Sequence, residues 1–557
     1  MRNEPGAMVL SGLIVLGAGI LALKRVPDLS GRPDTLRSWW QRNRWAVIAV
    51  EILFVVLFAL WAVVRAHQNN VVTTEKPMDL AFLASIVRGE TFPPQDPWLS
   101  GYAISYYYFG YVIAGMFTKL SGVVAGVGYN LWTAMLFALT GVTAFGVVYN
   151  LVRVRGSQAA GIGIGFVGLF AVAVMGNYEM PLVDMPYMDR TASAAYLRFW
   201  DVRDRQEPLA QTAPAWDWWW FRSARVLHDR NLPGMPSESE EVINEFPMFS
   251  YVLADNHPHV MALPFALLAM GIGLSLALNK NPAGTAMAVF ASITVGGLIF
   301  LNTWDTPIYI GLLVGAEALR LYAERKGRFK INDGMALIAF GGLTVGTMLV
   351  FYLPFLVSFG SQLGGALPNF IHPTATQQLL LTFGALFPLT ILYLAVEGWR
   401  GGRALNWRAG HHHGQIFLAI LGVMALLTLL AAVNPAWLGP QQSYLTQAGG
   451  EAWGAMFAKR ISYLLTTVLL LAGVFVIAAR LFGRPDANGV LPLHAADRLR
   501  AVDDRRRAAA RARAGLCLPA RRLRKPHEHG VQVLLSGVGA AGRSDRVRRM
   551  DGRGWRG

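Results

Sequence analysis

The sequence has few charged residues and a single cysteine. Charged residues make up 15% of the chain, and apolar residues make up 54%. Soluble domains carry about 25% charged residues. The one cysteine, Cys517, cannot form a disulfide within one chain. A chain this poor in charge and this rich in apolar side chains does not have the composition of a soluble enzyme.

The apolar residues form long runs that polar residues seldom interrupt. A helix needs about 20 mostly apolar residues to cross a bilayer, and backbone polar groups in hydrocarbon must be satisfied within helices or closed barrels. The runs are continuous and do not alternate with polar residues, so they predict helices. We therefore expect an all-α, polytopic integral membrane protein with about 11 to 13 transmembrane helices. The apolar runs are 8–23, 45–65, 102–119, 128–151, 159–175, 259–278, 284–301, 306–323, 334–358, 378–396, 415–434 and 462–482.

The net charge of +16 does not indicate a nucleic-acid-binding protein. Residues 484–557 hold 18 Lys and Arg against 7 Asp and Glu, a net charge of +11, so residues 1–483 carry only +5. A small positive excess is ordinary for membrane proteins with basic cytoplasmic loops. We expect a multi-pass protein of the plasma membrane, with membrane lipids as partners and no nucleic acid.

Basic residues in short loops mark the cytoplasmic side and orient the spans. Residues 1–44 comprise the first span and a basic cytoplasmic loop that contains Lys24, Arg25 and Arg44. Residues 45–483 then form the main membrane domain, which we expect to have long extracytoplasmic loops.

The two long outer loops are 66–101 and 177–258. If every run between 102 and 175 crossed the bilayer, residues 177–258 would lie inside, whereas the next span must run inward. One run therefore does not cross fully, or a crossing is not visible in the sequence. The run 102–119, which contains five tyrosines, is the best candidate for a re-entrant or interfacial segment.

Residues 484–557 break the hydrophobic pattern. Ala and Arg dominate there, as in Arg505–Arg511, which is typical of a disordered basic tail. A frameshift in GC-rich DNA is a second interpretation. If the last two bases of each codon are read with the first base of the next, Leu516–Ala541 permits FVYLRDVFENRMNTVFKFYYQAWVLL, a loop followed by an apolar segment. We interpret the tail as a frameshifted end of the membrane domain, which resequencing of the locus would test.

Three ordered blocks of the sequence resemble a known family. The first comprises Glu75–Asp79, Phe92–Trp98 and Tyr106–Gly110, the second runs over Glu245–Phe265, and the third is Asn302–Asp305. Together they resemble the YYY membrane-protein family, a domain of unknown function named for its tyrosine triplet. The RMNTVFK string of the shifted frame resembles a later block of this family, which the printed chain lacks.

The YYY family is in turn distantly similar to membrane glycosyltransferases of the GT-C type. Those enzymes share a layout of a span, a long outer loop with acidic residues, and a Pro- and Tyr-rich entry to the next span. The resemblance implies a GT-C-like architecture, a polyprenyl-phosphate sugar donor and chemistry at the extracytoplasmic face. It also implies substrate-binding roles for Asp96, Tyr106, Tyr107, Tyr108 and Trp304. A likeness at the level of fold does not itself establish activity.

Sugar transfer from a lipid phosphate needs a base for the acceptor hydroxyl and cations for the leaving phosphate. Glu75 and Asp79 are four residues apart and share one face if the segment is helical. Either is a candidate catalytic base, with a pKa raised by partial desolvation; the alternative is that they cap a loop helix. Lys76, Arg222 and Arg225 are candidate phosphate ligands, although cations near lipid headgroups are common.

Asp255, His257 and His259 alternate at a spacing of two. In an extended segment they would face one side, where His257 and His259 could bind a divalent metal cation and Asp255 could serve as a catalytic carboxylate. The alternative is a pair of hydrogen-bonded structural histidines. Asp305 lies where an apolar span meets the outer surface, which makes it a candidate catalytic residue; the alternative is a turn that caps the span 306–323.

The sequence thus predicts a membrane-embedded enzyme that transfers a sugar from a polyprenyl-phosphate donor at the extracytoplasmic face. A transporter or flippase and a non-catalytic membrane protein are the alternatives. Inverted repeats and broken helices would support a transporter, and the sequence shows no clear internal repeat. Convergence of Glu75, Asp79, Asp255, His257 and Asp305 on one outward-facing site would favour the enzyme.

Overall fold

The computed structural model describes most of the chain up to residue 483. The described residues are 3–25, 36–154, 156–212, 221–232, 239–279, 281–325, 329–360, 372–402, 405–433 and 452–483. They are predominantly helical, as the apolar runs predict, and one short two-stranded sheet accompanies the helices. The tail 484–557, for which we predicted a frameshift, lies outside the described residues.

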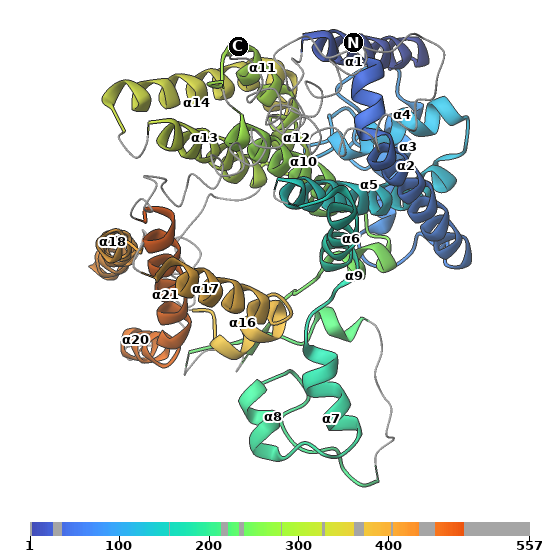
Figure 1. Ribbon diagram of the computed structural model, residues 1–557. Coiled ribbons are helices and arrows are strands. Elements are labelled where there is room, and N and C mark those ends of the chain that lie inside the picture. Colours follow the sequence, from blue (N-terminus) through green and yellow to red (C-terminus); the bar gives the residue numbers. More distant parts are fainter. Residues whose placement is uncertain are drawn as a thin grey trace, which may run out of the picture. The chain divides into compact units, whose positions relative to one another are not determined.

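The first membrane helices pack around α5 (Ala125–Arg153), with α2 and α6 along its sides (Figure 1). Trp61 of α2 stacks on Phe137 of α5 with ring centroids 4.0 Å apart. At Gly141 of α5 the backbone approaches Leu57 so closely that a Cβ atom would lie 2.5 Å from its Cδ1. Small residues at such positions let membrane helices pack tightly. The other elements here are α1 (Pro5–Arg25), α2 (Leu36–His67), α3 (Lys76–Arg88), α4 (Phe109–Ser121), α6 (Gln158–Leu169) and η1 (Phe170–Val174), a π-helical turn.

Contacts at the helix ends fix which ends share one side of the bilayer. Nε of Arg65, at the end of α2, donates to Oδ1 of Asn130, near the beginning of α5, at 3.0 Å. The hydroxyl of Tyr129 donates to the carbonyl of Ala254, just before α10 (Pro258–Leu278), at 2.8 Å. The end of α2 and the beginnings of α5 and α10 therefore lie together.

This arrangement favours one assignment of the membrane crossings between residues 102 and 175. Because α5 and α10 begin on the same side, α5 and the continuous α6–η1 unit supply the two crossings between them. Helix α4 has 13 residues, which is too few to cross a bilayer. In this arrangement the run 102–119 is the segment that does not cross fully, and the described residues of 177–258 lie on the side where α2 ends.

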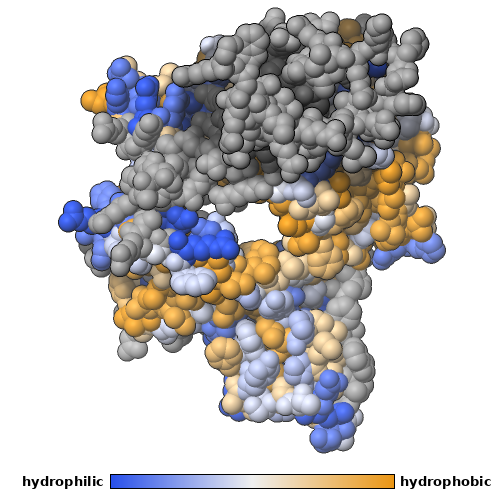
Figure 2. Space-filling view, in the orientation of Figure 1, coloured by the Kyte–Doolittle hydropathy of each residue, from blue (hydrophilic) through white to orange (hydrophobic). Residues whose placement is uncertain are grey.

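The described part of residues 177–258, which we predict to be the second outer loop, forms a folded polar segment. Val183, Leu197, Val202 and Val226 are fully buried and form its small hydrophobic cluster. In Figure 2 the surface over α7 and α8 mixes hydrophilic, intermediate and hydrophobic residues, whereas the surface over α2 is mainly hydrophobic. Strands β1 and β2 pair antiparallel. The elements are η2 (Met180–Asp184), α7 (Met185–Met188), α8 (Ala194–Trp200), η3 (Arg222–Ala224), β1 (His228–Arg230), β2 (Ser239–Glu241) and α9 (Pro247–Leu253).

Helix α10 connects the site region to the next group of helices. It packs on α5 and on α13, while α11 packs on α14. The chain bends between α11 and α12 at Gly296, where a Cβ atom would fall 2.0 Å from the carbonyl oxygen of Ser292, so only glycine fits. The elements are α11 (Thr285–Thr294), α12 (Gly297–Leu301), α13 (Asp305–Glu324), α14 (Ile331–Phe351) and α15 (Leu353–Leu356).

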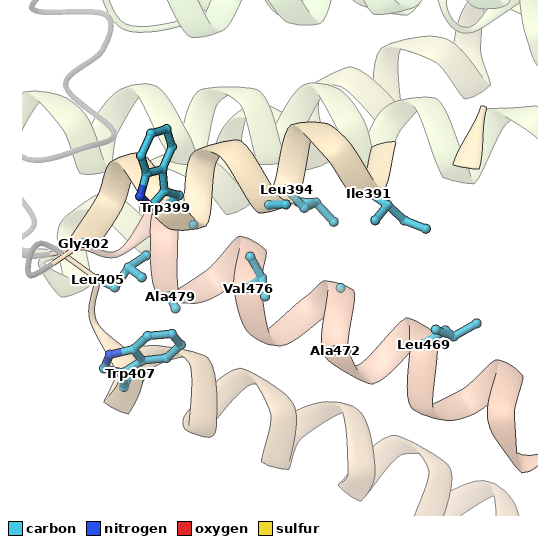
Figure 3. A pocket seen from close by; sticks show the side chains of 13 residues that line it. Ile391, Leu394, Trp399, Gly402, Leu405, Trp407, Leu469, Ala472, Val476 and Ala479 are labelled. Atoms are coloured by element: carbon cyan, nitrogen blue, oxygen red, sulfur yellow. The ribbon is translucent and has the colours of Figure 1, made fainter. Parts of the chain in front are cut away.

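The last group of described helices contains a sharply bent pair and an apolar groove. Helices α16 and α17 meet at 96°. Helices α17 and α21 line a groove of about 660 Å³ whose lining residues are all apolar, with Trp399 and Trp407 at one end (Figure 3). The elements are α16 (Thr376–Phe383), α17 (Phe387–Gly401), α18 (Trp407–Val433), α20 (Ala452–Ser462) and α21 (Leu464–Leu481).

The structure confirms the all-α polytopic class. Each apolar run named above overlaps a helix. Among the described residues, 6 helices are long and apolar enough to cross a membrane, or 7 if the bent pair α16–α17 is one span. Three shorter apolar stretches, Pro5–Ile20, Gln158–Val174 and Thr285–Leu301, add to these.

Candidate functional site

The site is built around α3, a short helix that follows the end of α2. Two consecutive threonines before it, Thr73 and Thr74, have φ angles of 67° and 49°. β-Branched residues rarely adopt this left-handed region, and strain of this kind is often found at functional sites. Glu75 occupies the N-cap position with non-helical backbone angles. Glu75 and Asp79 differ sharply in exposure: the Glu75 side chain is 59% exposed, whereas Asp79 is 0% exposed.

Asp79 lies among polar groups from three other segments. The hydroxyl of Tyr111, on α4, donates to its Oδ1. The hydroxyl of Tyr129, on α5, lies 3.4 Å from its Oδ2. Its carboxyl group also shares a hydrogen bond with the Asp255 carboxyl. Among the described residues, this completely buried acid is hydrogen-bonded to hydroxyl and carboxyl groups and has no direct cation partner.

His257 joins this buried pair to the surface. Its Nδ1 lies 2.7 Å from Oδ1 of Asp255, and its Nε2 is hydrogen-bonded to Glu75. Pro258 occupies the first turn of α10, which leaves His257 at the N-cap with extended backbone angles. We call Glu75, His257, Asp255 and Asp79 the site cluster. It is a continuous chain of hydrogen bonds from an exposed carboxylate to a buried one.

Burial and mutual contact set the protonation of the site cluster. Burial, followed by the hydrogen bond to Asp255, raises the pKa of Asp79 to about 8. Burial also disfavours an ionised Asp255, but its hydrogen bond to His257 and the charge of that ring lower the pKa of Asp255 overall. Burial disfavours a charged His257, but Asp255 and the other carboxylates raise its pKa to about 9. At neutral pH the cluster therefore holds a protonated Asp79, an ionised Asp255 and an imidazolium.

The same residues could also hold a cation. Asp79, Asp255 and His257 each offer one ligand atom, and these atoms lie within 4.8 Å of one another. Two carboxylate oxygens and one imidazole suit a divalent cation such as Mg²⁺ or Mn²⁺. His259, the second predicted metal ligand, is not in this group; its Nε2 faces Oε2 of Glu245 at 3.9 Å.

The tyrosine triplet divides between the site and the neighbouring aromatic packing. Tyr106 packs on Phe82 of α3 and is close enough to the site cluster for its carboxylates to raise the pKa of the tyrosine, after burial. Tyr107 packs on Phe359 with ring centroids 5.1 Å apart. Tyr108 is buried and packs edge-on against Phe300 at 4.6 Å. Only the first tyrosine is placed to act at the site.

The predicted phosphate ligands occupy different places. Lys76 is buried at the beginning of α3, where burial, followed by the nearby charge of Arg65, lowers its pKa. Arg222 is buried in the second outer loop and is bound to Asp184 at 3.2 Å. Arg225 binds Oε1 of Glu245 at 2.9 Å. Both arginines are engaged inside the loop segment, and only Lys76 lies beside the site cluster.

Asp96 and Asp305 accept hydrogen bonds from residues close to them in the chain, and Trp304 lies at the surface. Oδ1 of Asp96 accepts hydrogen bonds from the backbone N–H groups of Trp98 and Leu99 at 2.8 and 2.9 Å. Asp305 begins α13 and accepts a hydrogen bond from Asn302 at 3.2 Å. Trp304 is 42% exposed. The sequence analysis expected five residues to converge if the protein is an enzyme. Four of them, Glu75, Asp79, Asp255 and His257, meet in the site cluster. The fifth, Asp305, is hydrogen-bonded to Asn302.

Sequence reasoning missed three residues that complete this region: Tyr111, Tyr129 and Arg65. Tyr111 and Tyr129 contact Asp79 from positions 32 and 50 residues further along the chain, so no local sequence pattern indicates that they belong to the site. The sequence could have indicated Arg65, because it is an ionisable residue at the end of an apolar run.

Comparison with known proteins gives one family. Residues 2–501 match the family described as "Uncharacterized membrane protein (DUF2298)". No curated protein and no solved structure matches the chain. The chain therefore belongs to this membrane-protein family. The match confirms the expectation of an uncharacterised multi-pass family, and it carries neither the YYY name nor the likeness to GT-C enzymes.

Proposed function

We propose that this member of the DUF2298 membrane-protein family is a glycosyltransferase of the GT-C type. In this proposal it lies in the plasma membrane and transfers a sugar from a polyprenyl phosphate at the extracytoplasmic face. The observation that supports the proposal is the site cluster. An exposed carboxylate, Glu75, is hydrogen-bonded to a histidine that is itself backed by two buried aspartates. Perturbed acids joined in this way are typical of catalytic sites.

Glu75 is the proposed base, because it is the accessible member of the cluster. The acceptor hydroxyl oxygen forms a bond to the anomeric carbon while the bond from that carbon to the phosphate oxygen breaks. The bonding electrons leave with the polyprenyl phosphate, and the hydroxyl proton passes to the Glu75 carboxylate. His257 orients that carboxylate, and Asp255 and Asp79 hold His257 in place. Asp79 is a positioning residue here, since no acceptor reaches a carboxyl group that is 0% exposed.

A divalent cation is the second way in which this site could work. It would take the place of the proton shared between Asp79 and Asp255, and His257 would then bind it in the neutral form. Such an ion would supply positive charge for the leaving phosphate. Transfer that is lost with a chelator and restored by Mg²⁺ or Mn²⁺ would support this arrangement; transfer unchanged by the chelator would contradict it.

The proposal is tested with purified protein and a panel of polyprenyl-phosphate sugars. Glu75→Gln should lower transfer by about a hundredfold to ten-thousandfold, the usual contribution of a general base. Glu90→Gln is the matched control, because Glu90 is an exposed glutamate in the same outer loop and should leave transfer unchanged. Full transfer by the Glu75 variant, or no transfer by the unsubstituted protein with any donor, would contradict the proposal.

One observation favours a transporter as the second candidate. Broken helices are common at transport sites, and α16 and α17 form such a pair with a bend of 96°. A transporter predicts that protein-containing vesicles move a fluorescent lipid-linked sugar across the bilayer without forming a glycosidic product. Transfer of the sugar to an acceptor without such movement would reject it.

A further inference from the structure

A second polar site lies beside the site cluster, between the end of α2 and the beginning of α5. It is a pocket of about 440 Å³ that includes Arg65, Asn69 and Asn130. The remaining lining residues are small or apolar, among them Ala62, Val127 and Leu131. The pocket thus has a polar end and an apolar wall. It differs from the α17–α21 groove, whose lining is entirely apolar (Figure 3).

Arg65 is the central residue of the polar end. It is 2% exposed. Its Nε donates to Oδ1 of Asn130 at 3.0 Å, and its Nη1 donates to the carbonyl of Val252 at 3.5 Å. Its Nη2 has no hydrogen-bond partner among the described residues. A buried guanidinium with an unsatisfied N–H group is costly, and an anion in the pocket would satisfy it.

The beginning of α5 supplies a second attraction for an anion. Val124, Gly126 and Val127 line the pocket, and they are the N-cap and the first turn of a 29-residue helix. No side chain caps this end of the helix. The N-terminal N–H groups of a helix and its dipole together favour a negative charge. The pocket therefore has two independent sources of positive electrostatic potential, Arg65 and the beginning of α5.

The pocket and the site cluster are adjacent parts of one structure. Tyr129 reaches Asp79 of the site cluster, and the next residue, Asn130, holds Arg65. The buried Lys76 lies near enough to Arg65 for the two charges to disfavour each other. Two buried cations therefore lie close together here, and Asp255 is the acidic group that acts on Lys76.

We propose that this pocket binds the phosphate headgroup of an amphiphilic lipid, with Arg65 and the beginning of α5 on the phosphate and the apolar wall on the chain. Val124 and Val127, which line the pocket and are 71% and 47% exposed, add exposed apolar surface beside it. The inference rests on the proposed function in one respect: it takes the phosphate to be that of the lipid-linked sugar donor. The binding site itself does not depend on any transfer reaction.

Binding is measured on the full-length protein in maltoside micelles, which contain no phosphate. The probe is farnesyl phosphate, and farnesol is the matched uncharged compound. Arg65→Met should weaken farnesyl phosphate binding about tenfold to a hundredfold, as expected for the loss of a charge-assisted hydrogen bond. Arg88→Met, on the exposed side of α3, should leave binding unchanged. Equal binding of farnesol, or full binding by the Arg65 variant, would overturn the proposal.

A pair of glycine substitutions tests the pocket without touching Arg65. A Cβ atom at Gly126 meets nothing within 4 Å, so Gly126→Leu should be accommodated and should fill the pocket. Gly146, on the same helix, is equally open, and Gly146→Leu is its control. We expect the Gly126 variant alone to lose farnesyl phosphate binding at least about tenfold. Equal binding by both variants would place the ligand elsewhere and overturn the proposal.

Two further probes identify the source of the phosphate. Inorganic phosphate should bind much more weakly than farnesyl phosphate, and equal binding would overturn the lipid assignment. Tighter binding of dihexanoyl phosphatidylglycerol than of farnesyl phosphate would assign the pocket to ordinary phospholipid and overturn its assignment to the donor. Asp79→Asn separates this inference from the proposed function, because it should abolish transfer and leave farnesyl phosphate binding intact.

Discussion

Two acid clusters, the site cluster and one in the second outer loop, bury their carboxyl groups in opposite ways. In the site cluster the side-chain exposure falls from 59% at Glu75 to 21% at His257 and 9% at Asp255. The second region, which we call the loop cluster, comprises Glu179, Asp184, Arg205 and Arg222 of the outer loop. There the two acids are 0% exposed, and the arginines are 6% and 9% exposed.

The two clusters also differ in charge. Asp184 accepts hydrogen bonds from Arg205 at 3.1 Å and from Arg222 at 3.2 Å, so two arginines face this one acid. Burial, followed by the hydrogen bond to Asp184, raises the pKa of the neighbouring Glu179 to about 9. The site cluster has three carboxyl groups and one histidine. Sealed and compensated buried ion pairs are usually structural, whereas an incompletely compensated chain that reaches the surface can move a proton. The comparison indicates that a candidate catalytic cluster is distinguished by contact with solvent and by charge that is not fully compensated, more than by burial alone.

The sharpest test of this comparison uses one buried histidine from each region. His257 is paired with Asp255 in the site cluster, and His228 faces Asp201 at 3.3 Å in the outer loop. His257→Gln should lower sugar transfer by about a hundredfold to ten-thousandfold, because it interrupts the chain of hydrogen bonds to Glu75. His228→Gln should leave transfer per folded molecule unchanged. Equal losses in the two variants would remove the distinction between the regions.

A substitution in the loop cluster should lower the stability of the protein and leave its rate of sugar transfer unchanged. Arg222→Met removes a cation that contacts both acids and breaks its buried ion pair with Asp184, which costs about 3–5 kcal/mol. Denaturant titration of the purified protein should show this loss in the free energy of unfolding. Arg198→Met is the control, because its ion pair with Glu207 is exposed and should contribute little. A stable Arg222 variant with lost transfer would instead support the original expectation that Arg222 binds phosphate.

The sequence predicts the helices better than it predicts these clusters. Apolar length is a local property, so every predicted run overlaps a helix. The site cluster was predicted in part, because Glu75 and Asp79 lie close together in the chain, as do Asp255 and His257. Their connection depends on a contact between residues 182 positions apart, Glu75 and His257. Arg222 is a counterexample: its acidic partner Asp184 lies 38 positions earlier, so the sequence alone made it resemble a free phosphate ligand.

The pH dependence of stability should reveal the site cluster. Asp79 keeps its proton in the folded protein up to a pKa of about 8 but loses it near pH 4 when unfolded. His257 has a folded pKa of about 9, so its stabilising charge is present below about pH 6.5 and is lost as the pH rises. Both groups therefore make the free energy of unfolding fall between about pH 6.5 and 8, each by at most about 1.4 kcal/mol per pH unit.

Asp79→Asn should make this decrease shallower, because the amide does not titrate. Unfolding is measured across pH 5.5 to 8.5 with a chelator present, so that bound cations do not contribute. Asp189→Asn changes an exposed carboxylate at the end of α7 and should leave the slope unchanged. A slope that is identical in the unsubstituted protein and the Asp79 variant would contradict the protonated state assigned to Asp79.

The smallest expected effect separates a tyrosine of the site from a tyrosine that only packs. Tyr111 and Tyr251 are both almost fully buried, and each hydroxyl has one buried side-chain partner, Asp79 for Tyr111 and Thr140 for Tyr251. Each Tyr→Phe substitution should cost about 1 kcal/mol of stability through one lost hydrogen bond. Only Tyr111→Phe should also lower transfer, by about fivefold to tenfold, since its hydroxyl positions Asp79 beneath His257. If Tyr251→Phe lowers transfer equally, the hydroxyl of Tyr111 only stabilises the fold. The assignment of Asp79 to the site cluster would then be contradicted.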